Sequence, residues 1–147
     1  MAADAWVVYN EFKTNLGEKL FDLSSDTFKM ALFLSTSNCG DAALATAQYT
    51  TLTNQHASAY GYTTGGATVA PTWTESSGTV TFDTANAAWT ASGGSIVCRY
   101  AVIYDDSATN KDLVCYSLLD NAPADITVTT GNTLTVSINA SGVFTLA

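Results

Sequence analysis

Few residues in this chain could carry catalytic chemistry, and the single histidine is the first to consider. His56 follows Gln55 in a polar stretch of sequence. A histidine general base needs an orienting carboxylate and a nucleophile within reach, and no local pattern supplies either. We therefore interpret His56 as a surface or hydrogen-bonded loop histidine. No catalytic residue is expected, so the chain is not predicted to be an enzyme.

Three acidic residues, Asp105, Asp106 and Asp112, bracket a polar loop and are the best candidates for a divalent cation. An EF-hand calcium loop places acidic side chains at alternate positions around a central glycine. The residues between Asp106 and Asp112 have neither feature. We interpret the loop as the solvated tip of a β-hairpin and expect no metal site, with an opportunistic divalent ion as the alternative.

The three cysteines, Cys39, Cys98 and Cys115, form no CxxC pair and are odd in number. A disulfide framework is therefore not indicated, and a four-cysteine zinc site is impossible. We expect reduced thiols, two of them buried in strands, in a protein made in a cytoplasm. Residues 61–66 are glycine-rich, but they lack the lysine and the following helix of a phosphate-binding loop. No cofactor is expected.

Aromatic residues and the only arginine supply the candidate contact residues, because such side chains are enriched at protein interfaces. Arg99 lies in a predicted strand and is expected to pair with a carboxylate, within the fold or across a subunit contact. Trp73 or Trp89 could form a sugar-binding platform, although tryptophans in a small β domain more often fill its core. The candidate interface residues are Trp6, Tyr9, Phe12, Trp73 and Arg99.

Composition limits the possible partners of the chain. The sequence has 147 residues, 47% of them hydrophobic and 12% charged, which is typical of one folded domain over residues 1–147 and excludes intrinsic disorder. The formal net charge is −8, so nucleic-acid and anionic-membrane surfaces would repel it. No apolar run is long enough to span a bilayer, and the N-terminus does not look like a secretory signal.

A helix is expected at the N-terminus, where apolar residues recur every three to four positions. It is predicted over residues 5–15, with a possible continuation to Leu20, and Asp4 is its candidate N-cap. Within the N-terminal segment 1–23 this helix covers one end of a β core. The alternative is that the segment is an arm that anchors the protein to a partner.

The rest of the chain has the turn spacing of an all-β domain. Residues 95–104 and 113–118 are expected to form a hairpin, and so are residues 125–130 and 133–138 around Gly131-Asn132. Further strands are predicted at 28–34, 67–73, 79–83, 89–92 and 143–146. Short strands at this spacing indicate an antiparallel β-sandwich, jelly-roll-like, with one short N-terminal helix.

Several loop-and-strand segments resemble a widespread family of small structural proteins of tailed bacteriophages and prophages. They are residues 8–13, 16–17, 21–23, 26–32, 61–66, 89–96, 99–104 and 138–146. The resemblance covers nearly the whole chain and includes no catalytic signature. The sequence departs from the family in its short tip at 105–112 and in Cys98 and Cys115, and no binding residue is carried over.

The resemblance implies a non-enzymatic virion component. A head decoration or cement protein, bound to the major capsid protein lattice and to copies of itself, is the first expectation. It would be made in the host cytoplasm and would end on the capsid surface. A tail or head–tail connector component is the alternative, and a carbohydrate-binding β-sandwich module is a further one.

Overall fold

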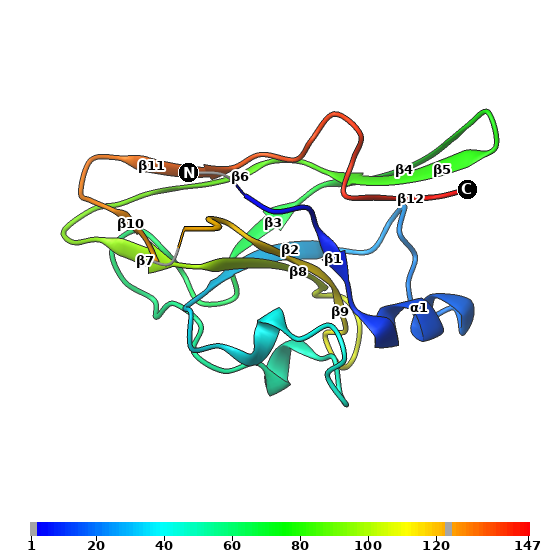
Figure 1. Ribbon diagram of the computed structural model, residues 1–147, viewed down its shortest axis with the longest axis horizontal. Coiled ribbons are helices and arrows are strands. Elements are labelled where there is room, and N and C mark those ends of the chain that lie inside the picture. The colour runs from blue at the N-terminus through cyan, green and yellow to red at the C-terminus, as the bar shows by residue number, and fades with distance from the viewer. Residues whose placement is uncertain (1–2, 123–124) are drawn as a thin grey trace.

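The computed structural model describes residues 3–122 and 125–147, which form a mainly β structure with one short helix near the N-terminus (Figure 1). The helical elements are α1 (Asn10–Gly17) and the 3-10 turns η1 (Asn38–Gly40) and η2 (Tyr49–Thr51). The strands are β1 (Val7–Val8), β2 (Phe28–Phe33), β3 (Ala67–Val69), β4 (Pro71–Ser76), β5 (Thr79–Thr84), β6 (Ala87–Thr90), β7 (Ile96–Cys98), β8 (Tyr100–Asp105), β9 (Leu113–Leu118), β10 (Ile126–Val128), β11 (Thr133–Val136) and β12 (Phe144–Leu146).

The largest sheet has the strand order β1-β9-β8-β2-β3, with every pair antiparallel. β2 pairs with β8 along its whole length, from Phe28↔Asp105 to Phe33↔Tyr100. β8 and β9 form the predicted hairpin, with a register shift between Ile103 and Tyr104. The structure confirms the strands predicted at 28–34 and 113–118. They form strands because both are apolar runs bounded by polar loops.

The other sheets have the orders β12-β5-β4, β11-β6 and β10-β7. Figure 1 shows β4, β5, β6, β11 and β12 along the upper side, above β1, β2, β8 and β9. The rings of Phe28 and Phe82 lie 5.3 Å apart and join the two sides. The mainly β architecture and the N-terminal helix are confirmed. The described residues form no closed barrel, and their pairing does not confirm a jelly roll.

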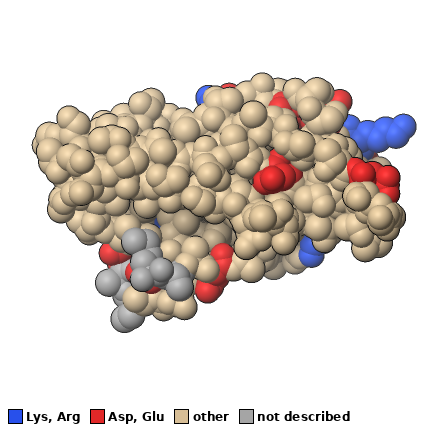
Figure 2. Space-filling model, turned by 90° about the horizontal axis from the view of Figure 1, so that it is seen from above, with Lys and Arg blue, Asp and Glu red and all other residues tan. Residues whose placement is uncertain are grey.

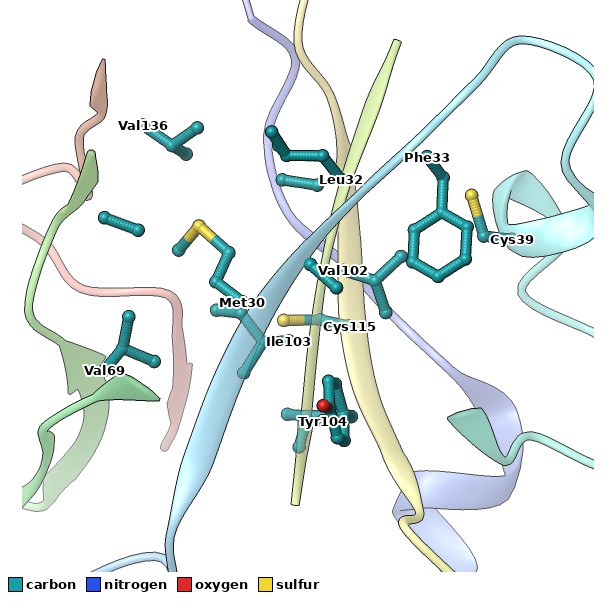
Figure 3. Packing of buried hydrophobic residues seen from close by; sticks show 14 of the residues in the cluster. Met30, Leu32, Phe33, Cys39, Val69, Val102, Ile103, Tyr104, Cys115 and Val136 are labelled. Atoms are coloured by element: carbon teal, nitrogen blue, oxygen red, sulfur yellow. The ribbon is translucent and has the colours of Figure 1, made fainter. Parts of the chain in front are cut away.

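The core explains why β2 is apolar at almost every position. Figure 3 shows Met30 pointing toward Val69 and Val136, whereas Phe33 lies beside Cys39 on the other side. Both Met30 and Phe33 are fully buried. A strand covered on both faces reads as a continuous hydrophobic run rather than an alternating one.

The N-terminal helix starts later than predicted. Val7 and Val8 form β1, which pairs with Tyr116 and Cys115 of β9. Asp4 is not an N-cap, because its amide donates to the Leu118 carbonyl as part of this edge pairing. The helical spacing of apolar residues is therefore overridden by an open strand edge that the sequence pattern does not display.

α1 begins at Asn10 and is preceded by Tyr9, whose side chain makes no cap hydrogen bond. It ends at Gly17, and Lys19 has a φ of 63°, so the helix does not continue to Leu20. Within the segment 1–23, Val7 and Val8 pair with β9, and the side chains buried in the core include Phe12, Phe21 and Leu23. The first two residues of that predicted segment lie outside the described residues.

The hairpin predicted around Gly131-Asn132 is wrong, although its turn exists. Gly131 has a φ of 87°, and the Asn132 amide donates to the Thr129 carbonyl. The two flanking strands then diverge, since β10 pairs with β7 and β11 pairs with β6. Ala91 separates them: it accepts from the Gly131 amide at 2.8 Å and donates to the Asn132 carbonyl at 2.9 Å.

Two predicted strands are each divided in the structure. Residues 95–104 split into β7 and β8 at Arg99, whose amide donates to the Phe33 carbonyl at 2.7 Å. Residues 67–73 split into β3 and β4 at Ala70. Pro71 begins β4, which is an edge strand as expected for a residue without an amide hydrogen.

Candidate interaction surface

Parts of the three longest uncharged stretches of the sequence meet at one end of the molecule. Residues 42–74, 84–98 and 126–147 contain no Asp, Glu, Lys or Arg. The pairings β6–β11 and β7–β10 bring the second and third stretches together, and the Ser92 amide donates to the Tyr60 carbonyl of the first. We call strands β6, β7, β10 and β11, with their turns at 60–62, 91–94 and 129–132, the uncharged end. It occupies the upper left of Figure 2, where no charged side chain is visible.

The outward face of β6 and β11 consists of small neutral residues. Ala88 and Thr135 are exposed cross-strand partners, and so are Thr90 and Thr133, whose hydroxyls lie 2.8 Å apart. The alternate residues of both strands point into the core, as the buried Trp89 indicates. The strand period of two therefore separates an apolar inner face from a neutral polar outer face.

Tyr60 is the large exposed side chain at the uncharged end, with 47% of its surface accessible. Its ring covers Gly94, because a Cβ placed on that glycine would lie 2.3 Å from the ring. Thr130 donates from its hydroxyl to the Gly94 carbonyl at 2.9 Å. Tyr60 is thus held against the turn instead of projecting freely.

Two of the predicted interface residues belong to the core. Tyr9 is fully buried and donates its hydroxyl to the Cys39 carbonyl at 2.6 Å. Phe12 is 2% exposed, and its ring lies 4.8 Å from Phe21 and 5.5 Å from Phe144. Both side chains stabilise the docking of α1, so neither is presented at the surface.

The tryptophans do not form an exposed sugar platform. Trp89 is 6% exposed and lies with its ring 5.9 Å from Tyr62. Trp73 is half-buried in β4 and contacts the rings of Phe82 and Phe144 at 6.5 and 6.4 Å. Each ring packs mainly against the aromatic core.

Trp6 borders an open groove of about 810 Å³ between the N-terminal segment and β11. The apolar residues that line the groove are Trp6, Leu119, Ile126, Leu134, Val136, Ile138 and Val143. Asp4 is the charged residue among those that line it. The groove adjoins the uncharged end, because Leu134 and Val136 belong to β11.

Arg99 is half-buried between β7 and β8. Its Nη1 donates to the Ala122 carbonyl at 2.7 Å. Arg99 lies between β7 and β8, Trp73 lies in β4, and Trp6 precedes β1. Of the five predicted interface residues, Phe12 and Trp73 share a neighbour, because both rings pack against Phe144.

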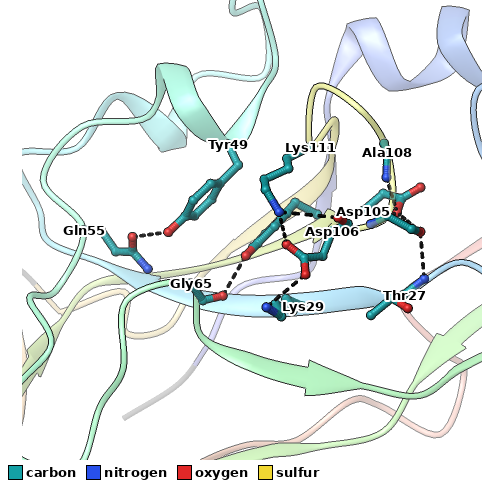
Figure 4. A network of polar contacts seen from close by, with 11 residues as sticks. Thr27, Lys29, Tyr49, Gln55, Gly65, Asp105, Asp106, Ala108 and Lys111 are labelled. Atoms are coloured by element: carbon teal, nitrogen blue, oxygen red, sulfur yellow. Dashed lines mark hydrogen bonds and ion pairs between the residues drawn. The ribbon is translucent and has the colours of Figure 1, made fainter.

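The charged side chains of the β8–β9 tip form a compact network (Figure 4). Asp106 accepts from Lys29 at 2.9 Å and also pairs with Lys111. These hydrogen bonds and charges lower the pKa of Asp106, with the Lys111 contact as the largest cause. The pairs tie the hairpin tip to β2.

Ser107, Thr109 and Asn110 are exposed, as expected for a solvated hairpin tip, whereas Asp105 and Asp112 at its base are buried. Asp105 is inaccessible to solvent, and its Oδ1 accepts from the Ser107 amide and hydroxyl and the Ala108 amide at 2.6–3.1 Å. Burial is the largest cause that raises the pKa of Asp105, and the nearby Asp26 carboxyl raises this pKa further. Asp112 is 6% exposed. Among the described residues, no three acidic, histidine or cysteine side chains are grouped to hold a metal ion.

His56 and the cysteines have structural positions. The His56 amide donates to the Leu32 carbonyl. His56 is 8% exposed, and its ring lies 5.3 Å from the ring of Tyr62. Burial lowers the pKa of His56.

All three cysteines are free and buried, with Cys98 in β7 and Cys115 in β9 as predicted. Burial raises the pKa of Cys98 to about 12, so this thiol stays protonated and unreactive.

Comparisons with known proteins add no family to this description. No family model matches the chain, and neither a curated protein nor a solved structure is significantly similar to it. Within the described residues, none of the helical segments has the length and apolar character needed to cross a membrane.

Proposed function

We propose that this chain is a non-enzymatic structural protein of a tailed-bacteriophage virion, most specifically a decoration or cement protein that binds the major capsid protein lattice. It is made in the host cytoplasm and ends on the capsid surface. Its finer architecture in this proposal is a jelly-roll-like β-sandwich. The proposal starts from the family resemblance of the sequence segments.

The observation that carries the proposal is the uncharged end. Interfaces between proteins are depleted of charged residues at their centres, because each buried charge must lose its hydration. Here a whole end of an acidic molecule has no charged residue in its strands and turns. Such a surface suits protein–protein contact in many copies.

The remaining surface suits a protein that is stored free before assembly. A net charge of −8 makes free copies repel one another and favours solubility. On a capsid lattice, many weak contacts act together and give stable occupancy. The charge therefore supports the free state, and the uncharged end supports the assembled one.

A tail or head–tail connector component is the main alternative, and the same surface would serve it. The carbohydrate-binding alternative has weaker support, because Trp89 is buried and Trp73 packs against Phe82 and Phe144. Copy number distinguishes a decoration protein from a connector. A decoration protein occupies many sites on the capsid lattice, whereas a connector is confined to the portal axis.

The test is a cryo-EM reconstruction of intact virions of the parent phage, with this chain fitted into the density. The expected result is density for the chain repeated over the capsid lattice. Density restricted to the tail or the portal axis would contradict the decoration role and support the connector. Absence of the chain from purified virions would overturn both assignments.

A further inference from the structure

We propose that the cavity between the β8–β9 tip and the segment before β2 binds one calcium ion, held by the carboxylates of Asp26 and Asp105. This site belongs to the free chain and does not depend on the virion role proposed above. Two features carry it: a pair of carboxylates that line one cavity, and a buried carboxylate oxygen that has no hydrogen-bond partner.

The cavity has a volume of about 410 Å³ and is lined by two parts of the chain that are distant in sequence. Asp26 comes from the segment between α1 and β2, whereas Asp105 and Asp112 come from the two ends of the β8–β9 tip. The lining also includes Ser107 and Asn110, which offer neutral oxygens. Carboxylates and neutral oxygens are the ligands that Ca²⁺ takes in proteins.

Asp105 supplies the oxygen that has no partner. Its side chain lines the cavity and is inaccessible to solvent. The Oδ1 atom accepts from the amides of Ser107 and Ala108, which fixes the carboxylate in the turn. The Oδ2 atom is buried and has no hydrogen-bond partner. Because a buried carboxylate oxygen without a donor or a cation is costly, this atom points to a ligand in the cavity.

The carboxyl of Asp26 strengthens this requirement. It interacts directly with Asp105, and its Oδ2 accepts from the Asp22 amide at 2.6 Å. Two carboxylates that share a site do not both ionise at low cost unless a proton or a cation lies with them. A shared proton needs only contact between the carboxyls. A calcium ion also needs room for water and for further oxygens, and the cavity provides both.

The charges around the cavity set the expected strength of the site. Asp112 lines it and adds negative potential, whereas Asp106 is excluded as a ligand because two lysines pair with it (Figure 4). Lys19 is the basic residue in the lining, and no ion pair between described residues joins it to Asp26 or Asp105. The described residues contain no group of three acidic, histidine or cysteine ligands. A site with two carboxylates is therefore a weak one.

The experiment is isothermal titration calorimetry of the full chain with CaCl₂ at pH 7, after removal of metal ions with a chelator. We expect one ion per chain and a Kd of about 0.1–1 mM, the range of calcium modules that work outside cells. Saturating CaCl₂ should also raise the Tm by about 3 °C. Absence of binding at about 10 mM CaCl₂ overturns the site. So does an equal rise of the Tm in NaCl of the same ionic strength.

Two variants place the ion between the paired carboxylates. Asp26→Asn and Asp105→Asn each remove one ligand charge, and each should weaken calcium binding by about tenfold or more. The matched control is Glu75→Gln, which removes the same charge at an exposed position of β4 and retains an acceptor for the Gly78 amide. It should leave the Kd within about twofold. An equal loss in all three variants overturns the location.

A third variant should improve binding. Lys19→Gln removes a positive charge from the lining of the cavity and should tighten calcium binding by about twofold or more. An affinity equal to or weaker than that of the parent chain overturns the placement of the ion in this cavity.

Thermal unfolding in calcium-free buffer shows that each variant is folded before its binding is interpreted. If one of the two aspartate variants does not fold, the other tests the same pair. The virion reconstruction is independent of these measurements. Calcium binding with no virion density would refute the proposed function alone, and virion density for a chain that binds no calcium would refute the site alone.

Discussion

The tip of the β8–β9 hairpin and the uncharged end are both rich in turns, but different interactions hold their shapes. At the tip, side-chain charges form the links: Asp106 pairs with Lys29 and Lys111, and Asp105 accepts three hydrogen bonds. At the uncharged end, the links are main-chain hydrogen bonds such as those that Ala91 makes to the turn at Gly131. An end ordered by its backbone needs no charged side chain, so it leaves no charge to be desolvated on contact.

The largest expected effect comes from crowding the backbone of the uncharged end. Gly61 has a φ of 92°, and a Cβ at this position would lie 2.1 Å from the Thr90 carbonyl oxygen. Gly61→Ala should lower the free energy of unfolding by roughly 2–4 kcal/mol, through strain and displacement of β6. Chemical denaturation measures the loss.

Gly78→Ala is the control for this backbone effect. Gly78 has a φ of 83°, and no atom lies within 4 Å of the place that an added methyl group would take, so only the left-handed conformation is penalised. Its loss should be about 1–2 kcal/mol. Equal losses in the two variants would contradict the importance of the close approach at Gly61.

Removal of the charge at the tip should have a smaller effect that depends on salt. Asp106→Asn removes the ion pairs with Lys29 and Lys111 and should cost about 1–2 kcal/mol at low salt and less at high salt. Glu18→Gln at the exposed end of α1 removes the same charge and should change stability by less than about 0.5 kcal/mol. A loss that does not depend on salt would show that charge is not what stabilises the tip.

The pH dependence of the tip has two opposite parts. The pKa of Asp105 is raised by burial, so its contribution to stability is complete below the unfolded-state pKa near 3.8 and is lost as pH rises through the folded-state value. The pKa of Asp106 is lowered, so its contribution is present above 3.8 and is lost as pH falls through its folded-state value.

Asp105→Asn separates these parts, because asparagine retains an acceptor for the Ser107 and Ala108 amides and carries no charge beside Asp26. We expect this variant to be about 1 kcal/mol more stable than the parent at pH 7, with the gain disappearing in acid. Thermal unfolding at a series of pH values measures it. A variant less stable than the parent at neutral pH would contradict the unfavourable ionisation of Asp105.

The smallest effect is expected from the exposed hydroxyl pair of the uncharged end. Thr133→Val removes the hydrogen bond to Thr90 and should cost about 0.5 kcal/mol without salt dependence, whereas Thr133→Ser should retain it. Denaturation at two salt concentrations checks both points. A salt-dependent loss would mean that electrostatics also holds this end.

The sequence alone predicts those elements whose local pattern matches their environment. The apolar runs at 28–34 and 113–118 form β2 and β9. The N-terminal helix is misplaced because the spacing around Val7 and Val8 suits a helix or a strand, and the edge of β9 decides between them. Such a decision depends on residues more than a hundred positions away.

Two of the five predicted interface residues prove to be buried for a similar reason. Residue type alone favours Tyr9 and Phe12, and only packing shows that they fill the core. The surface proposed for contact has a different signal, a lack of charge over residues 84–98 and 126–147, which is visible in the sequence. That signal does not say that β6 and β11 are neighbours, because Val136 and Ala87 are far apart in the chain. Local turn chemistry suggests the wrong pairing for this region.

The order of strands in the largest sheet also controls when the protein can fold. β2 pairs with β8, and β1 pairs with β9, which is made still later. The apolar segment Phe28–Phe33 therefore leaves the ribosome long before its partner β8 has been synthesised. Pairing between distant segments makes folding slow and leaves intermediates open to aggregation. We expect the nascent chain to stay unfolded until its last third has been synthesised. Its yield in cells should therefore depend on translation speed and chaperone supply as much as on final stability.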